Sequence, residues 1–349
     1  MTTIYEVAKA AQVSPATVSR VFNGASVSDA LTKRVRARAA ELGFVPNGVA
    51  RSLRRQRSDV IALIIPDIEN PFFTSLARGV EDAARVTGLS VVLCNSDEDV
   101  EREARYLHVA AAQQMAGVVI APASQWTTDL TPLLVRGIPV VAVDRRPHDA
   151  DVDVVMVDNR RGGQQATAHL YDKGYERVAC ITGPVGASTA DERLLGYTLE
   201  VEARLSARGR RSVRQRTQYV RRGNFRSDSG RVAMESLLSA RVAPDAVFVA
   251  NNLMAIGAIE ALTEAGIGLP EFGFISFGDL PWTRLLKPPL SAISQPARQL
   301  GRTATEVLQD RIAGRDSPTR TVVLGTELLE RESTALAPAS SPRTASTTP

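Results

Sequence analysis

The clearest chemical signal in this 349-residue sequence is the uneven placement of its basic side chains. Residues 1–57 hold ten basic and three acidic residues, a net charge of +7, so the other 292 residues carry −3 of the total of +4. Clustered guanidinium and ammonium groups attract polyanions such as nucleic acids. A small basic head on a mildly acidic body therefore indicates a polyanionic partner held by the head alone.

Motifs of the common enzyme classes do not occur in the sequence. It has no phosphate-binding P-loop, no GxGxxG after an expected strand and no GxSxG nucleophile motif, and His108, His148 and His169 lack metal-ligand spacing. Cys94 and Cys180 form no CxxC pair and are expected to be inert core residues. We therefore expect no enzyme activity, no cofactor and no metal.

A second run of arginines extends from Arg204 to Arg226 without an intervening acidic residue. It could bind a second stretch of nucleic acid, although it lies far along the chain from the basic head. We favour a solvated helix end and loop, because charge runs usually face water.

Cap residues predict the helices of the head. Thr3 and Glu6 have the spacing of a capping box, which starts the first helix. After a turn, Ser14 is a good N-cap and Pro15 fits the first position of a second helix over Pro15–Phe22. The apolar spacing along these two helices predicts that they bury Ile4, Val7, Ala8, Ala11, Val18 and Val21.

A third helix is expected over 29–42, behind Ser28 and ended by Gly43. Its buried residues are expected to be Leu31, Val35, Ala39 and Leu42. Three short helices with a tight turn between the first two match the helix-turn-helix plan, in which the second helix faces a partner. By spacing alone, any small helical bundle is an alternative.

From residue 59 onward, short apolar runs alternate with amphipathic stretches, such as those over 72–87 and 252–265. Continuous apolar strands that alternate with helices imply parallel sheets covered on both faces. Two such series predict two doubly wound halves, with a ligand cleft between the carboxyl ends of their strands. The expected strands are 60–65, 91–94, 118–121 and 140–143, then 178–182, 218–220, 246–250 and 274–276.

Two segments of the head, TIYEVAKAAQVSPATVSRVFNG and ELGFVPNGVARSL, resemble the amino-terminal domain of the LacI/GalR (lactose-repressor) family. The body resembles the effector domain of the same family, which shares its fold with periplasmic sugar-binding proteins. The resemblance extends from Thr2 to about Thr334. The matching segments of the body are PDIENPFF, PVVAVDR, ITGP, ERLLGY, NNLMAIGA and ISFGDLPW.

The resemblance implies an N-terminal all-α helix-turn-helix domain over 1–45 and a hinge helix and linker over 46–58. It further implies an α/β effector-binding and dimerisation domain over 59–335, made of two doubly wound parallel-sheet subdomains like those of periplasmic binding proteins. The tail 336–349 is rich in Ser, Thr and Pro and is expected to be disordered. Because this tail lacks leucine heptads, we expect a homodimer rather than a tetramer.

By the same resemblance, the second helix lies in the major groove of a DNA operator, with Pro15, Ala16 and Arg20 at base-reading positions. Arg20 can donate to guanine O6 and N7, which is worth about 1–3 kcal/mol against a wrong base. Contacts with phosphates or base edges, which set the register of the helix, are expected from Thr3, Thr17, Ser19 and Asn23.

The hinge helix is implied to bind the minor groove. Leu53 would insert between central base pairs with Ala50 packed beside it, and Arg54 would contact the DNA backbone. Gly48 weakens such a helix by about 1 kcal/mol relative to Ala. Leu53 as a plain linker residue is the alternative.

The resemblance also implies a set of cleft residues that suit a polyhydroxylated ring. Aromatic faces pack against C–H groups, while charged and amide side chains chelate neighbouring hydroxyls. Gly278 stands where relatives usually hold a ligand-gripping acid, and Asn252 replaces a common Asp, so a purine or phosphorylated effector stays open. Taken singly, each cleft residue could instead be core or surface. The expected effector-binding residues are Phe72, Phe73, Asp144, Thr189, Arg193, Phe225, Asn251 and Asp279.

We therefore expect a cytoplasmic, sequence-specific transcriptional regulator, a repressor, that binds a pseudopalindromic double-stranded operator as a dimer. A small effector in the cleft, a sugar or sugar derivative, would control it allosterically as inducer or corepressor. The alternative is an effector-independent DNA-binding protein with a vestigial cleft. A sugar-transport component would need an export signal and no basic head. No apolar run reaches the roughly 20 residues of a membrane span, so we expect no membrane partner.

Overall fold

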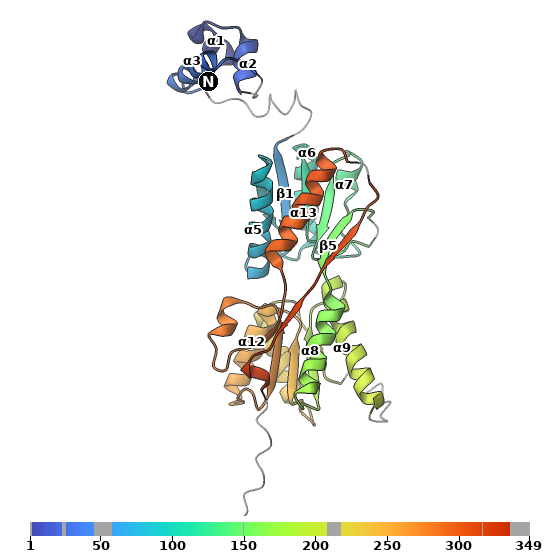
Figure 1. Cartoon of the computed structure of the whole chain (residues 1–349). Helices are drawn as coiled ribbons and strands as arrows, with labels where there is room; N and C mark the ends of the chain where they lie inside the picture. The colour runs from blue at the N-terminus through green and yellow to red at the C-terminus, as the bar shows by residue number, and fades with distance from the viewer. Residues whose placement is uncertain are drawn as a thin grey trace, which may run out of the picture. The chain divides into compact units, whose positions relative to one another are not determined.

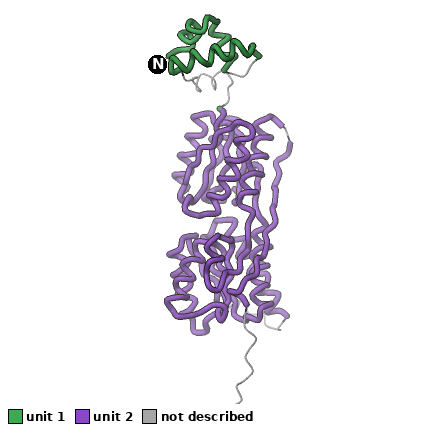
Figure 2. Tube along the Cα trace, turned by 60° about the vertical axis from the view of Figure 1, so that its left-hand side comes forward, with its two compact units in different colours: residues 1–58 green, residues 59–349 purple. Residues whose placement is uncertain are grey.

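The computed structural model describes residues 2–22, 26–44, 58–148, 150–207, 218–315 and 317–335. The chain divides into two compact units, Met1–Ser58 and Asp59–Pro349 (Figure 2). Several predictions lie outside the described residues, namely those for Asn23, Ala50, Leu53, Arg54, the hinge over 46–57 and the tail 336–349.

The first unit contains three helices in its described part: α1 (Ile4–Ala11), α2 (Pro15–Phe22) and α3 (Asp29–Glu41). The predicted capping box of α1 is confirmed. The Thr3 hydroxyl accepts the backbone N–H of Glu6, and the backbone N–H of Thr3 donates to the Glu6 carboxylate at 2.7 Å. Two of the donors that a helix start leaves without partners are thereby satisfied.

The turn between α1 and α2 also follows the sequence prediction. Gln12 adopts the left-handed conformation with φ 51°, which reverses the chain after α1. The Ser14 hydroxyl then accepts the backbone N–H of Thr17 at 3.1 Å, as expected of an N-cap. Ser28 occupies the N-cap position of α3, but its side chain makes no capping hydrogen bond.

The core of the first unit differs from the prediction at both ends of α3. Leu31 was expected in the core, but it is only partly buried and does not belong to the buried cluster. Leu42 was expected in the core, but it is 40% exposed. The helix ends at Glu41, and Gly43 with φ +61° turns the chain so that Phe44 packs on the core, its ring 5.7 Å from that of Phe22. The buried residues of this core are Val7, Ala8, Ala11, Val18, Val21, Val35 and Ala39.

The second unit contains two six-stranded sheets among its described residues. All strand pairs are parallel except β10 with β12. In the N-lobe the order is β11-β5-β4-β3-β1-β2, and in the C-lobe it is β12-β10-β9-β8-β6-β7. The N-lobe strands are β1 (Val60–Ile65), β2 (Ser90–Asn95), β3 (Gly117–Ile120), β4 (Val140–Val143), β5 (Asp153–Val157) and β11 (Thr321–Leu324). The C-lobe strands are β6 (Val178–Thr182), β7 (Val220–Arg222), β8 (Ala246–Val249), β9 (Gly273–Phe277), β10 (Ser291–Ser294) and β12 (Glu327–Leu329).

Helices cover both faces of each sheet, which confirms the predicted doubly wound architecture (Figure 1). In the N-lobe, α5 packs against α13, and α6 packs against α7. In the C-lobe, α8 pairs with α9 and α11 with α12. The N-lobe helices are α5 (Pro71–Val86), α6 (Val100–Ala112), α7 (Thr131–Leu134) and α13 (Ala297–Ile312). The C-lobe has α8 (Asn159–Asp172), α9 (Ser188–Ala207), α11 (Ser227–Leu238), α12 (Asn252–Glu264) and the short 3-10 helices η1 (Pro281–Arg284) and η2 (Glu332–Thr334).

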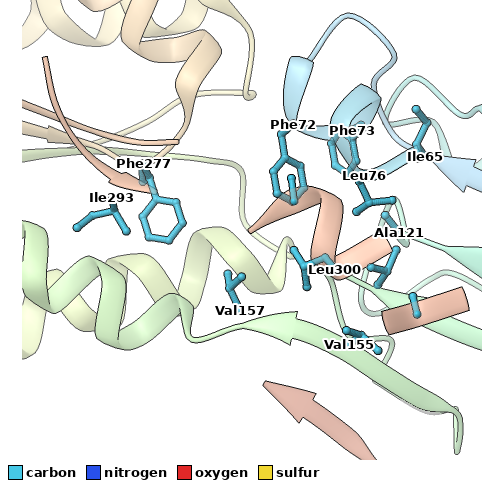
Figure 3. Packing of buried hydrophobic residues seen from close by; sticks show 14 of the residues in the cluster. Ile65, Phe72, Phe73, Leu76, Ala121, Val155, Val157, Phe277, Ile293 and Leu300 are labelled. Carbon is cyan, nitrogen blue, oxygen red and sulfur yellow. The ribbon is translucent and has the colours of Figure 1, made fainter. Parts of the chain in front are cut away.

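The chain crosses between the lobes from β5 to α8, from β10 to α13 and from β11 to β12 (Figure 1). These crossings join the β5/β11 edge of one sheet to the β10/β12 edge of the other. The main buried cluster includes residues of both lobes, and Figure 3 shows Val157 between Phe277 of the C-lobe and Leu300 of α13. The lobes are therefore hinged along one side, and β2 and β7 lie at the opposite side. Within the described ranges, no helix is long and apolar enough to cross a lipid bilayer.

Candidate effector pocket and DNA-reading helix

Helix α2 of the first unit presents the residues that the sequence assigned to DNA reading. Val18 and Val21 are buried beneath it. Ala16 and Arg20 are exposed, and partial exposure is found at Pro15, Thr17 and Ser19. Thr3 is exposed as well, although its hydroxyl donates to the Glu6 carboxylate at 3.0 Å. A compact, exposed helix face with one arginine is available for a DNA groove.

In the second unit, residues that follow the strands of both lobes surround a cavity of about 30 Å³. A water needs at least about 10–15 Å³ of such space, so this cavity has room for water, and a sugar ring enters only if its walls part. Two helix caps help to shape it, because Asn70 caps α5 and Asn251 caps α12. Seven of the eight predicted effector residues line this cavity, namely Phe72, Phe73, Asp144, Thr189, Arg193, Phe225 and Asn251.

Further lining residues were not predicted as effector contacts. Five of the seven lie within three residues after the end of a strand, at the carboxyl edge where ligands of open α/β sheets bind. That position is the signal that could have identified them from sequence. They are Asp67, Asn70, Glu98, Arg145, Asn252, Phe277 and Gln295.

Arg193 is the most extensively held side chain of the pocket. Its Nε donates to Asn159 Oδ1 at 2.8 Å, its Nη1 to the Ala250 carbonyl at 2.8 Å and its Nη2 to Gln295 Oε1 at 3.4 Å. Its guanidinium lies 3.8 Å from the centre of the Phe277 ring. Burial lowers the pKa of Arg193 to about 10, so the side chain stays charged at neutral pH.

Asp144 and Arg145 follow β4 and are both buried. Burial raises the pKa of Asp144, against the opposing charges of Arg193 and Arg145. Arg145 donates through Nη1 and Nη2 to the two carboxylate oxygens of Glu98, at 2.7 and 2.6 Å. Burial alone would lower the pKa of Arg145, but Glu98 and Asp144 outweigh it and the pKa is raised.

Three buried polar atoms of the pocket have no hydrogen-bond partner in the part of the chain that the structure describes. They are Asp144 Oδ1, Arg145 Nε and Asn252 Oδ1. An unsatisfied buried polar group costs about 1–3 kcal/mol. A ligand that offers donors to the two oxygens and an acceptor to the nitrogen would recover this cost, and hydroxyl groups do both.

Backbone strain is concentrated around the same cavity. Glu98, Asp144 and Phe225 adopt the left-handed conformation, with φ 57°, 64° and 68°. This conformation is unfavourable for residues other than glycine and gathers at ligand sites in proteins. A Cβ on Gly183 would lie 2.1 Å from the Phe225 ring, so glycine there leaves room for the ring.

Contacts between the lobes close the cavity. Asn252 Nδ2 donates to Asn70 Oδ1 at 3.0 Å, and the guanidinium of Arg145 lies 5.3 Å from the centre of the Phe225 ring. Arg226 of the C-lobe pairs with Asp97 of the N-lobe, on the side away from the crossings. The described lobes are thus held together around the lining residues.

Asp279 was predicted to bind the effector, but the structure places it outside the residues that line this cavity. Its carboxylate accepts from Arg331 Nη1 at 2.7 Å, Arg284 Nη2 at 2.7 Å and the Thr283 hydroxyl at 2.8 Å, and it is not among the lining residues. Burial alone would raise its pKa, but these hydrogen bonds lower the pKa from 3.8 to about 2. The neighbouring Gly278, with φ +110°, turns the chain at this point.

The described arginines of the second basic run are engaged within the body. Arg204 pairs with Glu200 and Asp172, and Arg222 pairs with Asp191. These pairs agree with the favoured interpretation of a surface helix end, while residues 208–217 lie outside the described part. Cys180 is buried in β6, whereas Cys94 in β2 is only partly buried.

Comparison with known proteins agrees with both units. The bacterial regulatory proteins of the lacI family match residues 3–47, and the periplasmic binding proteins and sugar-binding domain of the LacI family match residues 58–331. The ribose operon repressor of Halalkalibacterium halodurans is 35% identical over 96% of this chain and 97% of its own. The transcriptional repressor PurR of Aliivibrio fischeri is 32% identical over 95% and 98%.

Among solved structures, the lac repressor dimer bound to operator and the anti-inducer ONPF is similar to this chain. It aligns with a TM-score of 0.83 and 26% identity over 96% of this chain and 99% of its own. The curated relatives are repressors of transcription rather than enzymes, which confirms the function predicted from the sequence. The chain therefore belongs to the LacI family and is a transcriptional regulator with a DNA-binding head and a sugar-binding-type effector domain.

Proposed function

We propose that this chain is a cytoplasmic repressor that binds a pseudopalindromic operator as a homodimer. A neutral sugar of monosaccharide size, bound between the lobes, controls its affinity for DNA. The observation that carries the effector assignment is a set of three buried pocket atoms that have no hydrogen-bond partner among the described residues, Asp144 Oδ1, Arg145 Nε and Asn252 Oδ1. Two acceptors and one donor around one cavity match neighbouring hydroxyls.

The DNA-binding part of the proposal assigns base reading to Pro15, Ala16 and Arg20, because α2 exposes this face. Arg20 supplies the specific contact, since a guanidinium matches the two acceptors of guanine in the major groove. Register contacts are assigned to Thr3, Thr17, Ser19 and Asn23, and minor-groove contacts to Ala50, Leu53 and Arg54.

The second copy of the chain is proposed to dock on the β2 side of the N-lobe. β2 is an edge strand, and its Val92 and Leu93 side chains are about two-fifths exposed. An open strand edge with apolar side chains is a favourable pairing surface. Sedimentation of Val92→Asp should show weaker self-association than the wild type, and an unchanged dimer would place the interface elsewhere.

The aromatic lining of the pocket supports a sugar ring as the ligand. Phe72 of the N-lobe and Phe225 of the C-lobe offer ring faces for C–H groups, and Arg193 offers its fixed guanidinium. Because the cavity is too small for a ring as it stands, binding and release require the lobes to part and close again. This movement is the coupling to DNA affinity that we propose, with a typical coupling of about 1–3 kcal/mol.

A calorimetric panel tests the effector assignment. The purified chain is titrated with D-ribose, other pentoses and hexoses, hypoxanthine and guanine. The expected result is saturable binding of at least one neutral sugar, lost in Arg193→Ala and retained in Arg161→Ala, an exposed arginine of α8 outside the lining. Binding of a purine alone would reassign the effector class, and binding of no compound would favour the vestigial cleft.

A further inference from the structure

The charges around the cavity nearly balance, with one more acidic than basic side chain. Asp67, Glu98 and Asp144 supply three negative charges to the lining, and Arg145 and Arg193 supply two positive charges. Four of these five residues are at least nine-tenths buried. Buried charges act on a ligand more strongly than exposed ones because water screens them less.

Both arginines have their charge already matched by the protein. Arg145 gives both Nη groups to Glu98, and its Nη1 also donates to the Pro122 carbonyl at 3.2 Å. Arg193 donates all of its nitrogens to neutral oxygens of the protein, and its nearest opposing charge is Asp144. An anionic ligand would therefore meet two guanidinium groups whose charges the protein already opposes, with Glu98 beside Arg145 and Asp144 beside Arg193.

The backbone around Glu98 places its carboxylate next to Arg145. Its own N–H donates to the Pro66 carbonyl at 3.0 Å, and both Asp97 and Glu98 adopt the left-handed conformation. This tight turn after β2 brings the Glu98 carboxylate to Arg145, 47 positions further along the chain. Behind the pair, the buried Glu103 adds a further acid near Arg145.

We infer that the Glu98–Arg145 ion pair is the charge-selectivity element of the pocket, so that the protein accepts an uncharged sugar and rejects its phosphorylated form. Glu98 neutralises the guanidinium that would otherwise attract a phosphate, while Asp144 and Asn252 direct oxygens toward the ligand. Discrimination by placing an unfavourable charge against the competitor is a common route to specificity. This inference rests on the proposed sugar-binding function and deepens it.

The test compares two ligands that differ in charge but hardly in size. D-ribose 5-phosphate and uncharged 5-O-methylsulfonyl-D-ribose are titrated calorimetrically at pH 7.5 and 150 mM salt, with D-ribose as reference. If another neutral sugar of the panel is the ligand, the phosphate and the mesylate of that sugar replace the two ribose derivatives. We expect the phosphate to bind the wild type at least about tenfold more weakly than the mesylate.

Glu98→Gln should narrow this difference to about threefold or less, because it keeps the size of the side chain but frees the charge of Arg145. Glu101→Gln, an exposed carboxylate of the neighbouring helix α6, should keep the wild-type difference. Glu98→Asp, which is too short for the same pairing, provides a second variant if Glu98→Gln does not fold.

The outcomes separate this inference from the proposed function. If no neutral sugar binds the wild type, the proposed function fails and the inference fails with it. If the neutral sugar binds but the phosphate binds as well as the mesylate, only the inference is overturned. An equal rejection of mesylate and phosphate would make size the determinant and would also overturn it, as would folded Glu98 variants with an unchanged difference.

Discussion

Replacing Asp279 by Asn distinguishes a structural carboxylate from a ligand-binding one. In the structure this carboxylate joins the Arg331 segment, which follows the last crossing, to η1 through Arg284 and Thr283. The drop in its pKa from 3.8 to about 2 is worth about 2 kcal/mol, since each pH unit corresponds to about 1.36 kcal/mol. The Arg284 side chain is 66% exposed, so water screens its share, and Arg331 carries most of the effect.

Asp279→Asn should therefore lower the free energy of unfolding of the second unit by about 2 kcal/mol at pH 7. Urea titrations followed by tryptophan fluorescence measure this loss, because Trp282 lies in η1 beside the site. A native pKa below the unfolded one stabilises the protein above pH 3.8, and this contribution is lost as the pH falls toward 2. The difference between variant and wild type should vanish over that interval.

Asp310→Asn is the matched control, since Asp310 pairs with the exposed Arg315 and Arg320 on the surface. It should cost less than about 1 kcal/mol. Affinity for the neutral sugar should be unchanged in both variants. A loss of sugar affinity in Asp279→Asn without a loss of stability would refute the structural assignment and restore Asp279 to the effector site.

Three further predictions address the head, the pocket and its support. Arg20→Ala should relax discrimination at one base pair of each half-site by about 1–3 kcal/mol in binding to singly substituted operators, whereas a uniform loss over all sequences would contradict base reading. Arg193→Ala should abolish the effector response in gel-shift assays while operator binding persists; a normal response would place the effector elsewhere. Gly163→Ala should lower the free energy of unfolding of the second unit by about 1–3 kcal/mol in urea titrations, because the added Cβ would lie 2.3 Å from the Arg193 carbonyl oxygen. An unchanged free energy of unfolding would argue against close packing of α8 on α9.

Local signals made the head predictable from sequence. The capping box at Thr3 and Glu6 and the Ser14–Pro15 start depend on residues within one turn. α1 starts after Thr3 as predicted, and α2 has the predicted bounds. Leu42 could not be placed by the same reasoning. Its exposure depends on the turn at Gly43 that brings Phe44 onto the core, and apolar spacing within the helix carries no information about that turn.

Strand prediction succeeded where a strand is apolar and buried on both faces. β1, β4 and β6 have the predicted bounds, and each lies inside its sheet. The strands β5, β10, β11 and β12 were missed. β11 and β12 are edge strands with exposed positions, and β10 contains two serines, so their strand character depends on pairing with distant segments.

The pocket was predicted through family resemblance, and its chemistry became visible only in three dimensions. Glu98 and Arg145 are 47 positions apart in the sequence, and the residues around each of them do not predict that the two side chains pair. The partner of Asp279 could not be predicted for the same reason, because Arg331 lies 52 positions later in the sequence. Apolar periodicity predicts which residues are buried, but it does not predict which buried charged side chains form ion pairs.

The most direct test of the account measures DNA affinity with the pocket filled and unfilled. Genomic fragments that the purified chain retains are sequenced to define the operator, and its affinity is then measured by fluorescence anisotropy with and without the neutral sugar that calorimetry identifies. We expect tight operator binding and a change of about 5–150-fold on addition of the sugar, absent in Arg193→Ala. Failure to bind any duplex at modest salt, or an operator affinity that a saturating bound sugar leaves unchanged, would contradict the account.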